Sequence, residues 1–435
     1  MHNYIEKIIY FTIFFIPFSF ALNLQKDVDI SFLRVVISLS FLIFLFYLIY
    51  KNKLIFLDRF KNKQTYFLIL FFIWAGISAF WSLNAVWSIR KLVFFATIIP
   101  IYFLVIYIIN SEEKLKKISK VFIFSGFLAS LVGVFQFFSQ FIFGLDKIYN
   151  FWAYEVSMFL YGQNFGSVVI ANQSWFVNIG GKDYFRAISL FPDPHTFSLY
   201  LGILIPFAFG FFFYSSRKNK PLFFLQVTVM FLALLFTFSR GAYVGFLASF
   251  IFMTIFYLRY FKLKINKKII ISATLVFLIF ISVFINSVFS QRLASSFSLS
   301  DISNAGRIQI WETSFDVFFE NPVLGAGLGS LPVFFDPKAS VKSPINAHNT
   351  YLDILSELGL VGIFLFFAFL FYLFKNLLFK KDKFDFLRLG ILWSLAWFLV
   401  HSFFETSLFS VPVLVSFCFV TAIPVILKEL SATND

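Results

Sequence analysis

The chain has 435 residues, of which 60% are hydrophobic and 13% are charged. A water-soluble protein of this length could not cover so much apolar surface with so few charged groups, so the composition excludes a soluble globular fold. The formal net charge is +14. A charge of this sign also occurs in nucleic-acid-binding proteins, so its distribution along the chain decides its meaning.

Apolar runs recur along the chain, and each is long enough, or nearly so, to cross ~30 Å of hydrocarbon, which takes ~20 helical residues. Because a chain in lipid must satisfy its own backbone polar groups, each run is predicted to be a helix. The runs cover residues 8–22, 31–50, 65–81, 92–109, 121–141, 196–214, 221–238, 241–258, 269–289, 359–379, 386–404 and 408–427. The first run lacks a small-residue cleavage site, so we expect a retained helix. We predict an all-α integral membrane protein with about 12 transmembrane helices.

The basic residues gather in alternate loops. If Met1 lies in the cytoplasm, the cytoplasmic segments and helix ends hold 24 of the 36 Lys and Arg, but 8 of the 22 Asp and Glu. This positive-inside pattern predicts that both termini are cytoplasmic. The net charge is then a topology signal next to lipid headgroups. We expect membrane lipids as partners and no nucleic acid.

The residue types that bind metals are scarce. Cys418 is the single cysteine, and the four histidines have no spacing typical of metal ligands. We therefore predict no metal site and no cofactor.

Two predicted outer segments, residues 142–195 and 290–348, are too long to be simple connections. The second contains a predicted helix over 305–320, with Asn304 as its cap and a Pro after its end, and a new helix is predicted to begin at 347–349. We expect one polytopic membrane domain over 1–435, with both segments forming an outer, periplasmic cap of short helices.

Residues that could carry chemistry fall in four places, all on the predicted outer face. They are Arg186 with the stretch Phe191–His195, the turn Ser239-Arg240-Gly241, Arg307 and Trp311 with the glycine-rich turn that contains Gly325 and Gly327, and His348-Asn349 followed by Gly359 and Gly362. Arginine presents a planar donor fork that suits phosphate oxygens, and histidine can take a proton near neutral pH. Together they predict a site for an anionic, phosphorylated, lipid-linked substrate, with a proton-transfer step.

Each of these residues also has a structural interpretation. Arg240 could anchor a helix end at the lipid headgroups, and His348 could cap a helix. The run Gly325–Gly329 follows no predicted strand, so we interpret it as a tight turn and not as a dinucleotide loop. Gly359 and Gly362 would allow close helix packing. On their own, His195, His401 and Glu405 are weaker candidates.

The stretch from His348-Asn349 to Gly359-Leu360-Val361-Gly362 resembles the signature of the bacterial O-antigen ligase and O-antigen polymerase membrane family. The likeness extends to the Arg307–Gly327 block, the Ser239-Arg240-Gly241 turn and Arg186, and covers roughly residues 180–365. One position departs, because the family commonly has Pro-Asn where this chain has Pro194-His195.

The resemblance implies a GT-C-like, metal-independent glycosyltransferase of the bacterial inner membrane that works on the periplasmic side. Such an enzyme moves a glycan, with inversion, from undecaprenyl diphosphate to an acceptor hydroxyl. His348 would be the general base, and Arg186 and Arg307, with Arg240 as a third candidate, would bind the diphosphate. Supporting roles would fall to Trp311, Gly325, Gly327, Asn349, Gly359 and Gly362.

The acceptor distinguishes the possible reactions. Lipid A-core as acceptor implies an O-antigen ligase of lipopolysaccharide synthesis, which we favour, and another lipid-linked repeat implies a polymerase. A protein hydroxyl would imply a protein O-glycan transferase. A flippase or transporter of lipid-linked glycans is less consistent with the few ionisable residues in the apolar runs.

The charge pattern makes a prediction that can be tested by labelling. Single cysteines introduced on a Cys418→Ser background should react with a membrane-impermeant reagent in intact cells only where the chain faces outward. The expected cytoplasmic positions are Lys114, Arg217, Lys264 and Lys381, and the expected outer positions are Asp146 and Asp336. Labelling of Lys264→Cys in intact cells would contradict the topology.

Overall fold

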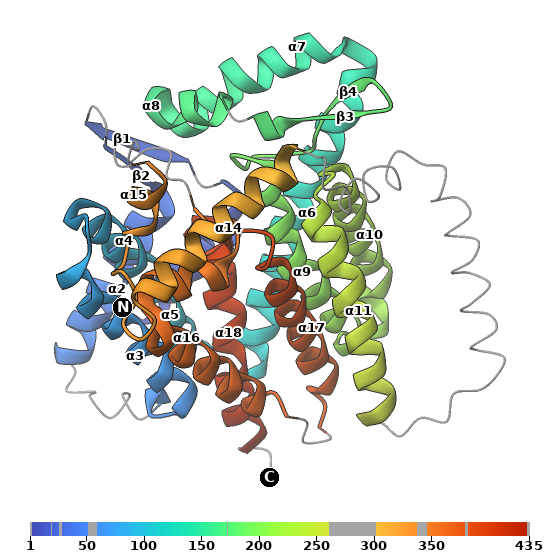
Figure 1. Ribbon diagram of the computed structural model, residues 1–435. Coiled ribbons are helices and arrows are strands. Elements are labelled where there is room, and N and C mark those ends of the chain that lie inside the picture. Colours follow the sequence, from blue (N-terminus) through green and yellow to red (C-terminus); the bar gives the residue numbers. More distant parts are fainter. Residues whose placement is uncertain are drawn as a thin grey trace.

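A computed structural model describes residues 2–18, 20–25, 28–50, 59–171, 173–260, 302–336, 346–378 and 382–432 of the chain. These residues form a bundle of helices that lie side by side, with a cap of shorter elements across one end (Figure 1). The bundle helices are α1 (His2–Phe14), α2 (Phe32–Tyr50), α3 (Lys63–Ser78), α4 (Ala85–Ile98), α5 (Pro100–Ile108), α6 (Glu112–Phe143), α9 (Pro194–Tyr214), α10 (Lys220–Phe236), α11 (Arg240–Tyr260), α16 (Thr350–Asn376), α17 (Asp385–His401) and α18 (Val411–Ala432).

The bundle confirms that the protein is a multi-pass membrane protein. Nine helical segments within the described residues are long and apolar enough to cross a membrane, with α4 and α5 together forming one of them. Two other predicted spans correspond to α1 and α17, which have 13 and 17 residues and fall short of the ~20 that a crossing takes. The predicted span at 269–289 lies outside the described residues, so the total of about 12 stays a prediction.

The cap contains the short elements of both long outer segments. They are α7 (Leu145–Asn150), the π-helix Phe151–Ser157, α8 (Met158–Ile170), β3 (Phe176–Ile179), β4 (Lys182–Phe185), α14 (Ile302–Glu320) and α15 (Leu331–Phe335). The helix predicted at 305–320 begins earlier, at Ile302, so the expectation that Asn304 caps it was wrong. The helix predicted to begin at 347–349 is α16, which begins at Thr350.

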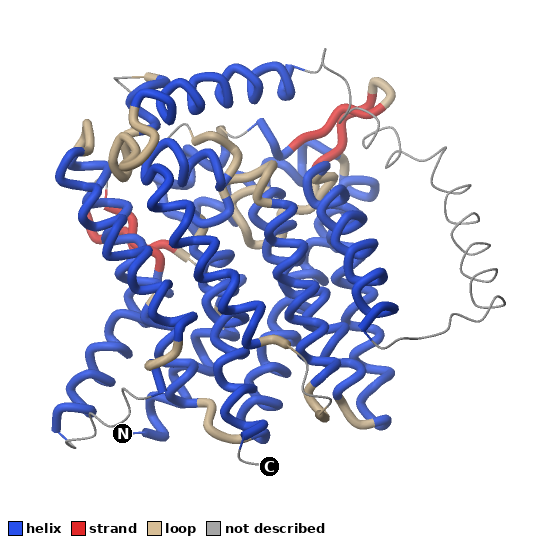
Figure 2. The backbone as a smooth tube through the Cα atoms, turned by 60° about the horizontal axis from the view of Figure 1, so that its bottom comes forward, coloured by secondary structure: helices blue, strands red, loops and turns tan. Residues whose placement is uncertain are grey.

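The prediction of an all-α fold needs one correction among the described residues, because two antiparallel hairpins are present. One joins β3 to β4, and the other joins β1 (Ala21–Gln25) to β2 (Val28–Ser31); Figure 2 shows both in red. The first apolar run was predicted to continue as helix to residue 22, but α1 ends at Phe14. From Leu22 the sequence alternates apolar and polar residues, which is the period of a strand.

Helix ends follow the expected chemistry. The Asp193 side chain accepts hydrogen bonds from the first backbone N–H groups of α9, and Pro194 occupies the first helical turn, where its missing N–H costs nothing.

Further along its length, α9 packs closely on α17. A Cβ on Gly210 would lie 2.6 Å from the Cα of Gly390, so neither position has room for a side chain.

Gly359 interrupts α16 near its outer end. Its φ of +65° and ψ of −164° lie outside the helical region, so the hydrogen-bond ladder breaks there. The carbonyl groups of Ser356 and Glu357 instead accept the N–H groups of Ala326 and Gly327, at 2.8 and 2.9 Å. The glycine-rich turn therefore docks on the break in the helix.

The remaining backbone groups next to the break also form hydrogen bonds outside the helix. Three groups of α16 find partners outside the helix: Leu360 N donates to Pro322 O at 2.9 Å, Val361 N donates to Val323 O at 3.3 Å, and Leu358 O accepts from Trp74 Nε1 at 3.0 Å. Gly359 was expected to allow packing between helices. It instead admits a loop backbone, since a Cβ there would lie 2.3 Å from Val323 O.

We predict that Gly359→Ala destabilises the protein by at least about 2 kcal/mol, because a side chain at positive φ costs ~1–2 kcal/mol and the Cβ would also overlap the docked turn. The measurement is the Tm in detergent. Gly306→Ala is the control, since nothing lies within 4 Å of its Cβ position in α14. Equal Tm values for the two variants would contradict the structural role of Gly359.

Candidate functional site

Glu405, in the loop between α17 and α18, is the centre of a charged cluster at the cap end of the bundle. Its carboxylate is buried. Arg307 Nη2 donates to Oε1 at 3.0 Å, and His348 Nδ1 lies 3.4 Å from Oε2. His195 Nδ1 lies 2.9 Å from Oε1. One carboxylate thus contacts one arginine and two imidazoles from three different helices or helix starts.

The N-terminus of α16 holds the Glu405 loop in position. Thr350 N donates to Ser402 O, and Thr350 Oγ1 donates to Glu405 O, both at 2.9 Å. Asn349 caps the helix, with Oδ1 accepting the N–H groups of Tyr351 and Leu352. Because Asn349 is the cap, the alternative interpretation of His348 as the capping residue does not fit the structure.

Trp311 and Asp353 fix the backbone just before His348. Trp311 Nε1 donates to Ala347 O at 2.9 Å, and Ala347 N donates to Asp353 Oδ1 at 3.0 Å. The other Asp353 oxygen accepts from Thr406 Oγ1 at 2.7 Å. Asp353 therefore joins the two segments that carry His348 and Glu405.

His348 itself is in a strained and accessible position. Its φ is +47°, a region that non-glycine residues rarely adopt. Its side chain is 47% exposed, whereas that of Glu405 is 11% exposed. Strain of this kind persists where surrounding contacts impose it, and it is common at functional sites.

The pKa values of His348 and Glu405 are shifted in opposite directions. The hydrogen bond to Glu405 raises the pKa of His348, and burial opposes this only in part. For Glu405, burial would raise the pKa, but His195 and Arg307 outweigh burial and hold the pKa well below its usual value. Glu405 is therefore ionised, and a proton on His348 is stabilised by it.

Arg186 is buried and makes backbone contacts. Its Nε donates to Thr237 O at 2.6 Å, and its Nη1 donates to Ser174 O at 2.8 Å. Arg186 thereby ties the first long segment to the turn between α10 and α11. Its binding of a diphosphate stays a prediction.

The Ser239-Arg240-Gly241 turn packs directly on the Glu405 loop. A Cβ on Gly241 would lie 2.9 Å from Phe404 Cβ and 3.0 Å from His401 Cδ2. Arg240 is half-buried at the start of α11. The structure thus brings residues of all four sequence features around the loop that carries Glu405, which the sequence analysis named as a weaker candidate.

A second acidic residue of α16 lies beneath the cluster. Glu357 forms a buried ion pair with Lys91 of α4, whose Nζ lies 2.6 Å from Oε1 and 2.8 Å from Oε2. Glu357 Oε1 also accepts from Leu331 N at 3.3 Å. This pair fixes α4, α15 and α16 against one another and has a structural role.

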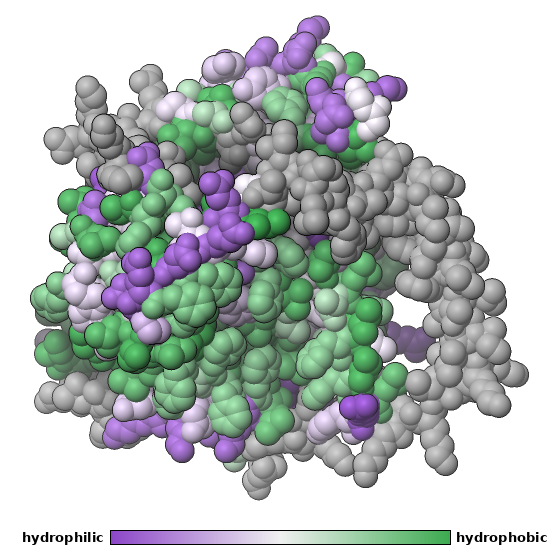
Figure 3. All heavy atoms as spheres, in the orientation of Figure 1, coloured by the Kyte–Doolittle hydropathy of each residue, from purple (hydrophilic) through white to green (hydrophobic). Residues whose placement is uncertain are grey.

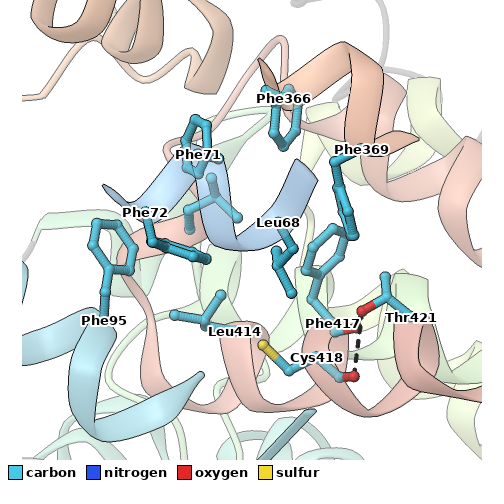
Figure 4. A pocket seen from close by; sticks show the side chains of 11 residues that line it. Leu68, Phe71, Phe72, Phe95, Phe366, Phe369, Leu414, Phe417, Cys418 and Thr421 are labelled. Atoms are coloured by element: carbon cyan, nitrogen blue, oxygen red, sulfur yellow. Dashed lines mark hydrogen bonds between the residues drawn. The ribbon is translucent and has the colours of Figure 1, made fainter. Parts of the chain in front are cut away.

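An apolar pocket in the bundle is separate from this cluster. It is lined by Leu68, Phe71, Phe72, Phe95, Phe366, Phe369, Leu408, Leu414, Phe417, Cys418 and Thr421 (Figure 4). Its one hydroxyl, on Thr421, donates to the backbone of its own helix. With no charged group in its lining, the pocket offers nothing to bind a phosphate, and we do not include it in the site.

No group of three or more His, Cys, Asp or Glu side chains in the described ranges is arranged to hold a metal ion. The Glu405 carboxylate is instead surrounded by one arginine and two imidazoles. What it can do is bind an anion next to a proton acceptor.

Residues 225–367 match the family model described as O-antigen ligase. The chain contains an O-antigen ligase domain. The resemblance of the motifs to this family is therefore confirmed. The protein is a membrane-embedded lipid-linked glycan transferase of lipopolysaccharide synthesis. The O-antigen ligase match includes Arg240, Arg307 and His348, whereas Arg186 and Glu405 lie outside it. No curated protein sequence matches the chain.

We predict that Glu405→Gln lowers the pKa of His348, because the carboxylate that favours the imidazolium is lost while burial remains. Histidine-selective NMR can follow this titration, since the chain has only four histidines. Glu312→Gln, on the exposed side of α14, is the matched control and should leave the titration unchanged. An unchanged pKa in Glu405→Gln would show that the 3.4 Å contact has no electrostatic effect.

Proposed function

We propose that the protein is an O-antigen ligase. It transfers a glycan from undecaprenyl diphosphate to a hydroxyl of lipid A-core, on the periplasmic side of the inner membrane and without a metal. The observation that carries this proposal is the Arg307–Glu405–His348 cluster, in which a fixed cation and an accessible base share one carboxylate.

His348 is the general base. Its Nδ1 faces Glu405, which leaves Nε2 of the half-exposed ring to accept the proton of the acceptor hydroxyl. Glu405 orients the ring and stabilises the imidazolium that forms, as a carboxylate does behind the histidine of a hydrolytic triad. Because a protonated imidazole cannot act as a base, transfer requires a pH above the raised pKa of His348.

Arg307 binds the diphosphate of the donor. Its Nη2 is held by Glu405, and its guanidinium is partly exposed, so further N–H groups of the fork can donate to phosphate oxygens. Two other arginines are proposed for this role: Arg240, at the start of α11, and Arg186, which is bonded to the turn that precedes α11. Fixed cations stabilise the negative charge that develops on the leaving group.

The proposed transfer of the glycan needs no cofactor. The acceptor oxygen forms a bond to the anomeric carbon of the donor glycan as its proton passes to His348. The bond between that carbon and the diphosphate oxygen breaks, and undecaprenyl diphosphate leaves with the electron pair. Attack from the side opposite the diphosphate inverts the anomeric carbon.

The proposed orientation rests on charge. The cap carries both long segments, whereas the C-terminal end of α18 lies at the opposite end of the bundle (Figure 1). Lys114 and Arg217, near the starts of α6 and η6 (Arg217–Asn219), belong to the basic clusters expected in the cytoplasm. This supports a periplasmic cap.

We predict that His348→Ala and His348→Asn fold, insert and bind the lipid-linked donor, but lose transfer by ~10²–10⁴-fold because the general base is absent. The assay is transfer of labelled glycan in proteoliposomes, with donor binding measured separately. Asn349→Ala is the control, since it removes a helix cap and should lower stability by ~0.5–2 kcal/mol before it lowers turnover. A normally active His348→Asn enzyme would end the general-base proposal.

The glycan profile of a deletion strain separates the ligase from its nearest alternative, a polymerase. Loss of all polymer from lipid A-core, with lipid-linked chains accumulating, is the result expected for the ligase. A single repeat remaining on the core would identify a polymerase with the same site chemistry.

A further inference from the structure

α14 has an inner face that packs on the protein. Val317 forms a buried cluster with Ala326, Leu331, Ala347 and Leu352, against which Ile310 and Trp311 also pack. Ser314, on the same face, is fully buried. These contacts fix the rotation of α14 about its axis and so decide which residues face outward.

The outward half of α14 is divided into two edges. Ile308, Phe315 and Phe319 are exposed and, at intervals of seven and four residues, share one edge. Glu312, Asp316 and Glu320 are also exposed and share the next edge, at intervals of four. Figure 3 shows this division as a purple band along α14 with green atoms directly below it.

The apolar edge leads toward the lipid-facing surface of the bundle. After α14 the chain exposes Val323 and Leu324. The hydrogen bond from Val361 N to Val323 O places this turn beside α16 just past Gly359. From there α16 exposes Leu360, Phe364, Phe367 and Phe371, at the spacing of one helix face.

Exposure at the apolar edge matches that of the membrane-spanning surface. Phe319 is 71% exposed and Phe315 43%, compared with 64% for Phe364 on α16. Figure 1 shows α14 crossing the front of the bundle obliquely, with its C-terminal end further from α7 and α8 than its start. The helix thus descends toward the lipid-facing residues.

We propose that α14 is an interfacial helix whose apolar edge, Ile308, Phe315 and Phe319 with Val323 and Leu324, inserts into the headgroup–acyl boundary of the lipid bilayer. Residues 308–320 contain three acidic and no basic residues. Attachment is therefore by apolar insertion and does not depend on anionic lipid, and the acidic edge remains in water.

This attachment has a consequence for the site. Arg307 immediately precedes the apolar edge and is bonded to Glu405. The bilayer surface therefore sets the depth of Arg307, which on the proposed function is the depth of the donor diphosphate. The insertion of α14 itself does not depend on the proposed function.

The test uses an environment-sensitive fluorophore on single cysteines, in a Cys418→Ser background reconstituted in phosphatidylcholine vesicles. The apolar-edge positions are Phe315→Cys and Phe319→Cys, the matched controls on the acidic edge are Asp316→Cys and Glu320→Cys, and Phe364→Cys is the lipid-exposed reference. Nitroxide-labelled lipid should quench the apolar-edge labels several-fold more than the acidic-edge labels, and raised salt should not change this.

Two results would overturn the proposal. One is equal or stronger quenching of the acidic-edge labels by nitroxide lipid. The other is an apolar edge shielded from both lipid and aqueous quenchers, which would mean that protein covers it. Because the readout is fluorescence and requires no glycan transfer, failure of the proposed function would leave the result interpretable. Quenching at Phe364→Cys verifies that each preparation is inserted.

Discussion

A buried carboxylate is unfavourable unless it is paired and hydrogen-bonded, and this constraint on Glu405 organises the cap end of the protein. Arg307 and His348 come from the second long segment, and His195 comes from the start of α9. The loop that carries Glu405 is bonded to the start of α16 through Thr350. Segments far apart in the sequence therefore meet because one negative charge requires them.

A second layer supports the first from beneath. The Lys91–Glu357 pair and the exchange of backbone hydrogen bonds at Gly359 fix the outer end of α16 against α4 and the glycine-rich turn. Asn349 then caps the same helix at its start. With both ends of this short segment held, His348 is maintained at a positive φ that a free chain would leave.

Residue patterns predicted much of this arrangement, and the features that they did not predict have physical reasons. Apolar runs predict membrane helices because lipid permits few alternatives, and the pairing of arginines with His348 predicts an anion site next to a base. Glu405 was only a weaker candidate from sequence, since a lone carboxylate after a helix is common. The spacing His401 to Glu405 next to an apolar run was the available signal.

Other differences come from tertiary context. Gly359 reads as a packing glycine in a continuous apolar helix, and only the docked turn reveals a break. The alternation of apolar and polar residues from Leu22 was not recognised as a strand signal, because it directly follows an apolar run. Arg186 donates hydrogen bonds to two backbone carbonyls, a set of contacts that no spacing rule predicts.

The break at Gly359 divides α16 into two mechanical units. The outer unit is clamped by the glycine-rich turn, whereas the inner unit, Leu360 to Asn376, is ~25 Å long at 1.5 Å per residue and faces lipid. Hydrophobic mismatch in thicker or thinner bilayers changes the tilt of such a segment. Although the helical ladder does not cross Gly359, the docked turn is bonded to Ser356 and Glu357 on one side and to Leu360 and Val361 on the other. The turn therefore couples a change in tilt of the inner unit to the segment that carries His348.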